Sequence, residues 1–181
     1  MMLKRILKNL CLHLCLCLSL LGCGGYPRIV SYPFGETSSS LNSVFSELTP
    51  QITERYLVFS SDRRQHQDIY LYDQQSKELL DLPGLNALDM ITGEPMISAD
   101  GSYIAFSGFR AGQSDIYLYN RDTHQLRNLT KSLKAQVRHP SISANGSMIA
   151  FEANVAGQWD ILIYNRYGQP LNFDPVYSEG D

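Results

Sequence analysis

The sequence contains one pattern three times. Each copy holds an apolar run with a phenylalanine, and an aspartate follows that phenylalanine nine residues later, at the start of an Asp-Ile segment. The three phenylalanines are Phe59, Phe106 and Phe151, and the three aspartates are Asp68, Asp115 and Asp160. Successive copies lie 47 and 45 residues apart. A fixed period of this length predicts a repeat architecture, in which each copy packs on its neighbours.

Each copy also carries strand and turn signals. Asp100-Gly101 and Asn145-Gly146 separate alternating runs, which is a strong hairpin signal. A further short apolar run follows each Asp-Ile segment, so every repeat offers four short strands. Four antiparallel strands at this period predict an all-β chain of β-propeller blades. About three blades are expected, at residues 56–100, 103–145 and 148–174.

The recurring residues resemble a known family. Pro95 to Gly101 and Pro140 to Gly146 both read Pro-x-Ile-Ser-Ala-Asp/Asn-Gly, and Ile-Ala-Phe and Asp-Ile segments follow. This pattern resembles the WD40-like blade repeat of the TolB family, whose propellers have six blades. Three blades would leave blade faces exposed, so we expect either an open partial propeller or a homodimer that closes a six-bladed ring. Residues 48–51 fit the strand that contains Pro95 and Pro140 poorly, so that strand of the first blade is expected from the C-terminal tail or a second copy.

The N-terminus predicts export and lipidation. Lys4, Arg5 and Lys8 precede an apolar run from Leu10 to Leu21, which is too short to span a bilayer as a helix. The following Gly-Cys resembles a bacterial lipobox, which implies cleavage after residue 22 and acylation of Cys23. We therefore expect a signal peptide at 1–22, a lipidated cysteine and tether at 23–43, and the propeller repeats at 44–181. The resemblance implies an extracytoplasmic lipoprotein facing the periplasm. Gly24, and not an aspartate, follows Cys23, which in proteobacteria would favour the outer over the inner membrane.

Charge argues against one class of partner. The chain has 15 Lys and Arg against 18 Asp and Glu, and the predicted signal peptide holds three of the basic residues and no acidic one. A mature chain with this acidic balance disfavours nucleic acid as a partner.

Three carboxylates at matching positions invite a metal-site hypothesis. Asp68, Asp115 and Asp160 recur in every repeat, which favours a structural role, because a short carboxylate at a strand start accepts backbone hydrogen bonds. Gly101 and Gly146 are interpreted in the same way, as turn residues. Neither a metal site nor a cofactor is expected, and we find none of the common nucleophile, zinc or phosphate-binding motifs. The sequence therefore predicts a protein that is not an enzyme.

Residues that break the repeat are better candidates for function. Arg63 and Arg64 lie in the loop before Asp68, Arg110 lies in the equivalent loop of the second repeat, and Trp159 lies in the third. Arginine and tryptophan are enriched at interface hot spots, so these four residues are the predicted partner-binding set.

The predicted function is a non-catalytic, lipid-anchored protein-interaction module of the cell envelope. The TolB resemblance implies envelope proteins as partners, such as a peptidoglycan-associated lipoprotein. The alternative is a periplasmic propeller protein that binds a small ligand or glycan. Exposed Tyr or Trp rings would favour that alternative.

Overall fold

The computed structural model describes residues 40–171. The predicted signal peptide, Cys23 and nearly all of the tether lie outside this range, as does the C-terminal segment from residue 172 onward. Within the described range there is no helix long and apolar enough to cross a membrane.

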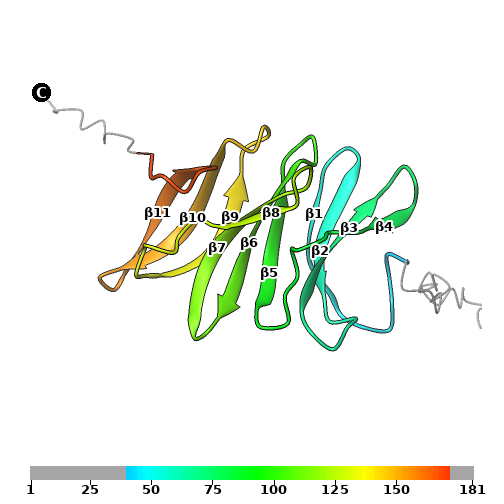
Figure 1. The fold of residues 1–181 in the computed structure, drawn as a ribbon, viewed down its shortest axis with the longest axis horizontal. Coiled ribbons are helices and arrows are strands. Elements are labelled where there is room, and N and C mark those ends of the chain that lie inside the picture. Colours follow the sequence, from blue (N-terminus) through cyan, green and yellow to red (C-terminus); the bar gives the residue numbers. More distant parts are fainter. Residues whose placement is uncertain (1–39, 172–181) are drawn as a thin grey trace, which may run out of the picture. The chain divides into compact units, whose positions relative to one another are not determined.

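The described residues form eleven strands in three antiparallel sheets (Figure 1). The first sheet, blade 1, has the order β1-β2-β3-β4, with bounds Glu47–Ile52, Tyr56–Ser61, Asp68–Asp73 and Glu78–Leu80. Blade 2 has the order β5-β6-β7-β8, with bounds Ile91–Ile97, Tyr103–Arg110, Gln113–Asn120 and Gln125–Asn128. Blade 3 has the order β9-β10-β11, with bounds Gln136–Ile142, Met148–Val155 and Gln158–Asn165. The prediction of an all-β chain with about three propeller-type blades is confirmed.

The first strand of each blade carries the same bulge. The residues Thr49, Glu94 and His139 have positive φ angles of 47°, 52° and 48°, and each precedes a proline. The strand register shifts at each of these sites. Proline lacks a donor for the strand ladder and is tolerated at edge strands and bulges, which explains its position here. The expectation that blade 1 lacks this strand is wrong, because β1 supplies it and Pro50 is the matching proline.

Two kinds of turn connect the strands. The β6–β7 hairpin closes with Ala111 and Gly112, whose φ angles are 51° and 84°, and Ala156 and Gly157 repeat this geometry in blade 3. Two positive φ angles in a two-residue loop are the signature of a type I′ turn. Asp100-Gly101 does connect β5 to β6, but in this turn only the glycine has positive φ.

Apolar side chains fill the spaces between successive blades. The cluster between blades 1 and 2 includes the fully buried Val58, Leu71 and Phe106, and a second cluster between blades 2 and 3 includes Ile116 and Phe151. Both faces of the middle strands of blade 2 are therefore buried. This explains why those strands are almost continuously apolar in sequence.

Blade 3 differs from the other two at its outer edge. A single bridge joins Tyr164 to Pro170, and the Leu171 amide donates to the Ile163 carbonyl at 2.8 Å. The chain thus enters the place of a fourth strand beside β11. The rest of the predicted fourth strand, Asn172 and Phe173, lies outside the described residues.

Candidate interaction surface

The Arg63 side chain makes its contacts with other residues of the same chain. Its side chain is only 6% exposed and pairs with Glu47 at 2.8 Å. The guanidinium also donates to the carbonyl oxygens of residues 40 and 41, and it lies over the rings of Phe59 and Tyr70 at 5.2 and 5.3 Å from their centroids. Arg63 therefore covers the face of blade 1 that points away from blade 2, together with the segment that precedes β1.

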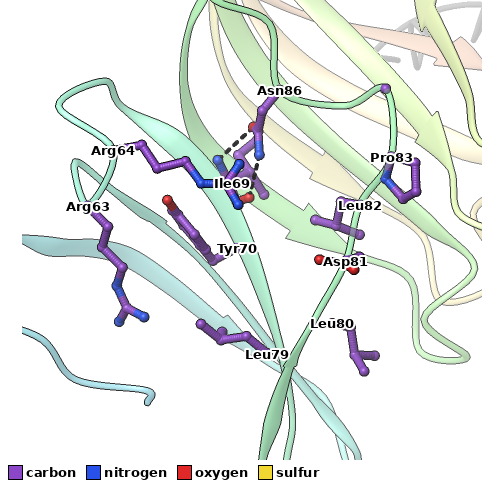
Figure 2. Close-up of a pocket in the computed structure, with 11 residues that line it drawn as sticks. Arg63, Arg64, Ile69, Tyr70, Leu79, Leu80, Asp81, Leu82, Pro83 and Asn86 are labelled. Atoms are coloured by element: carbon purple, nitrogen blue, oxygen red, sulfur yellow. Dashed lines mark hydrogen bonds between the residues drawn. The ribbon is translucent and has the colours of Figure 1, made fainter. Parts of the chain in front are cut away.

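Arg64 is exposed and borders a cleft of about 490 Å³ at the outer edge of blade 1 (Figure 2). Asn86 closes one side of this cleft, because its side chain accepts from the Ile69 amide and donates to the Ile69 carbonyl, both at 2.9 Å. The Tyr70 hydroxyl is buried and has no hydrogen-bond partner among residues 40–171. Burial raises the pKa of Tyr70 above its ordinary value.

Arg110 and Trp159 lie on blades 2 and 3. Arg110, beside the β6–β7 turn, pairs with Asp89 at 2.5 Å, and both side chains are substantially exposed. Trp159, just after the β10–β11 turn, is 39% exposed, and the Arg138 guanidinium lies 3.9 Å from its ring centroid. The four predicted partner-binding residues are thus distributed over the three hairpins, and only Arg63 among them has a largely buried side chain.

The repeated aspartates sit in different surroundings. Asp115 is buried and accepts from the Thr130 hydroxyl at 2.8 Å and from the Asn128 amide at 2.9 Å. Asp68 is buried and lies 3.0 Å from the His66 ring, whereas Asp160 is exposed. No three His, Cys, Asp or Glu side chains of the described residues gather as a metal site.

A tyrosine, a glycine and an arginine lock each pair of blades. The Tyr56 ring of blade 1 packs on Gly101 of blade 2, where an added Cβ would lie 2.3 Å from the ring. Arg121 of blade 2 lies 4.5 Å from the same ring centroid and donates to the Tyr56 hydroxyl at 3.2 Å. We call this arrangement the inter-blade lock.

The same lock joins blades 2 and 3. An added Cβ at Gly146 would lie 2.5 Å from the Tyr103 ring, and Arg166 donates to the Tyr103 hydroxyl at 2.9 Å. The Arg166 guanidinium lies 4.7 Å from that ring centroid. Because all three residues recur at corresponding positions, the lock is a repeated structural element of the interfaces between neighbouring blades.

Among residues 40–171, nothing packs on the outer face of blade 3. Ile69 and Ile116 are 1% and 0% exposed because each packs against the next blade, whereas their counterpart Ile161 is 65% exposed. Met148 stands in the place of Tyr56 and Tyr103 and is also exposed. We call the surface formed by Met148, Trp159 and Ile161 the open face.

The two ends of the blade array do not carry the residues of the lock. Met148 has neither the ring nor the hydroxyl of a tyrosine, and blade 1 has Glu54 and Gln74 at the places of the lock glycine and arginine. A six-bladed ring of two copies would bring these three residues together, so its two new interfaces would lack the lock. The homodimer stays a prediction, with this feature weighing against it.

Arg121 and Arg166 are not among the functional residues predicted from the sequence. Both directly follow an asparagine at the end of an Asp-Ile strand, so their repetition is visible in the sequence. Their partners lie on the preceding blade, 65 and 63 residues earlier, and only the packed structure shows that contact.

No protein-family model matches the chain, and no curated protein matches it. Solved structures do. TolB from Acinetobacter baumannii matches with a TM-score of 0.56 and 22% identity over 74% of this chain, and a protein assigned as TolB from Agrobacterium tumefaciens with 0.56 and 21% over 72%. The β-propeller domain of the Trilobed protease from Pyrococcus furiosus, which has an open velcro topology, matches with a TM-score of 0.52 and 13% identity over 71%. The chain spans 34%, 48% and 42% of these three structures. The chain is therefore similar in fold to the β-propeller of TolB, as its repeat pattern predicts.

Proposed function

We propose that this protein is a non-catalytic protein-interaction module whose open face on blade 3 receives a different protein. The observation that carries the proposal is the exposure of Ile161, whose counterparts in blades 1 and 2 are fully buried by a neighbouring blade. An apolar blade face that no other described residue covers is a typical docking surface.

Several features favour a different protein over a second copy. Blade 1 already has its outer face covered by Arg63 and the segment before β1, so it offers little free apolar surface to blade 3. The lock residues are also missing at both ends. A different protein brings its own complementary surface, so its binding requires neither free apolar surface on blade 1 nor the lock residues.

The proposal places the module outside the cytoplasm, anchored by lipid at Cys23. This part rests on the signal-peptide and lipobox pattern of the first 23 residues and on the TolB-like fold. Outer-membrane attachment and envelope proteins as partners belong to the same proposal. Labelled palmitate should be incorporated into the wild-type chain and should not be incorporated into a Cys23→Ala variant. Equal labelling of both would show that Cys23 is not the site of lipid attachment.

The absence of catalysis is likewise a proposal. Peptidases occur among the solved structures of similar fold, yet a similar fold at this identity carries no activity with it. The purified chain should leave chromogenic peptide substrates uncleaved, and turnover that follows the chain through purification would contradict this part.

Site-specific photo-cross-linking tests the interaction itself. A photoreactive amino acid at Ile161 should cross-link to one discrete protein in cells that naturally make this chain. The same amino acid at Lys131, an exposed position off the open face, should give no such product. Identical products at both positions, or no protein adduct at Ile161, would refute the proposed docking face.

A further inference from the structure

A groove of about 730 Å³ lies between blades 2 and 3, beside the β6–β7 turn. Blade 2 contributes the end of β6 and the start of β7, and blade 3 contributes the start of β9 and the two residues before it. Its lining also includes Trp159 of β11. The groove is separate from the cleft at Arg64, which lies at the edge of blade 1.

Two exposed aromatic side chains line this groove. Phe109 is 49% exposed and Trp159 is 39% exposed. Neither is demanded by the blade architecture, because the positions equivalent to Phe109 hold Asp62 and Asn154, and those equivalent to Trp159 hold Gln67 and Ser114. Large apolar side chains that break a repeat and face solvent are candidates for ligand contact.

The charge of the lining has one sign. Lys134 and Arg138 both border the groove, and none of its lining residues is acidic. Lys134 is exposed and forms no ion pair within residues 40–171, while Arg138 pairs with Glu152 at 2.7 Å. This basic patch lies on a chain that carries more acidic than basic residues overall.

From this combination we infer that the groove binds an acidic peptide segment of a partner protein, with a carboxylate at Lys134 and an apolar side chain between Phe109 and Trp159. Charge complementarity selects an acidic segment. A neutral sugar is disfavoured, because it carries no carboxylate and would leave Lys134 without a charge partner in the groove. The inference rests on the proposed protein-interaction function and names the chemistry of the partner.

The single tryptophan of the chain, Trp159, lines this groove and also belongs to the open face, so its fluorescence reports binding at either surface and the charge-reversal variants locate the site. The full-length chain in an uncharged detergent would be titrated with an acetylated, amidated hexapeptide of alternating glutamate and leucine. We expect a saturable change in Trp159 emission that weakens as salt is raised. The matched peptide with glutamine in place of glutamate should bind at least tenfold more weakly.

Two charge-reversal variants locate the site. Lys134→Glu should weaken binding of the acidic peptide at least tenfold, and Lys131→Glu, outside the groove, should leave it within twofold. Both lysines are exposed, so neither change should disturb folding, and circular dichroism checks this. Phe109→Ala should weaken both peptides, because it removes the apolar contact.

Three results would overturn the inference: no change in Trp159 emission with the acidic peptide, equal binding of the glutamine peptide, or saturable binding of a neutral oligosaccharide such as maltohexaose in its place. Failure here is distinguishable from failure of the proposed function. If the acidic peptide does not bind while a cross-link at Ile161 persists, the groove inference is wrong and the docking face stands.

Discussion

Replacing Gly101 with alanine should destabilise the chain more than the same change at Gly112. Both glycines have positive φ, at 77° and 84°, so both substitutions cost about 1–2 kcal/mol of backbone strain. The surroundings differ. A Cβ at Gly101 would lie 2.3 Å from the Tyr56 ring, whereas a Cβ at Gly112 would have no atom within 4 Å apart from its chain neighbours.

The ring must therefore move in the Gly101→Ala variant, and overpacking of this kind typically costs a further 1–3 kcal/mol or so. The lock contact between Tyr56 and Arg121 would be disturbed at the same time. We expect Gly101→Ala to lose about 2–5 kcal/mol of unfolding free energy and Gly112→Ala to lose about 1–2 kcal/mol.

Urea unfolding followed by circular dichroism measures both unfolding free energies. The free energies can be compared if the dependence of unfolding free energy on urea concentration, the m value, is the same in both variants. Tyr56→Ala provides a second test, because it removes the ring that the Cβ would strike. In that background the extra cost of Gly101→Ala should fall to the level of Gly112→Ala. Equal destabilisation by the two glycine substitutions in the wild-type chain would refute the inter-blade lock.

Further substitutions test the other contacts. Arg63→Ala should cost about 1–3 kcal/mol, because it removes the ion pair with Glu47 and uncovers the rings of Phe59 and Tyr70. Arg64→Ala should change stability by less than about 0.5 kcal/mol, and urea unfolding compares the two variants. Asp115→Ala should cost roughly 1–3 kcal/mol, because it leaves the buried Thr130 hydroxyl and the partly buried Asn128 amide without their acceptor. The same change at Asp160, the exposed aspartate of blade 3, should be nearly neutral in the same assay. Hydrogen bonds from Arg55 lower the pKa of Asp73 from 3.8 to about 2, so the stabilisation from this pair is present above pH 3.8 and lost as the pH falls toward 2. The stability gap between wild type and Arg55→Gln, measured by urea unfolding at each pH, should therefore shrink in that window; a gap that stays constant down to pH 2 would contradict this assignment.

The blade repeat was predictable because its strongest signals are local. Phe106 and Asp115 recur at fixed spacing because every blade buries a phenylalanine at the same position of its second strand and carries an aspartate in its third strand nine residues later. The first strand was missed because Leu48 to Gln51 looks unlike its counterparts. Pro50 was the available signal, since it lies 45 residues before Pro95, as Pro95 lies before Pro140.

The candidate site was less predictable, because it depends on contacts between distant parts of the chain. Arg63 resembles an ordinary loop arginine until the segment before β1 folds back and covers it. The openness of Ile161 is likewise invisible in sequence, because the residue repeats Ile69 and Ile116 faithfully and differs only in what packs against it.

Light scattering over a range of concentrations gives the solution mass of the chain from Gly24 onward. If the open face of blade 3 is free for a different protein, the chain should be a monomer whose mass does not change with concentration. A stable dimer would refute the proposed docking face, because a second copy would then cover the surface on which the partner docks.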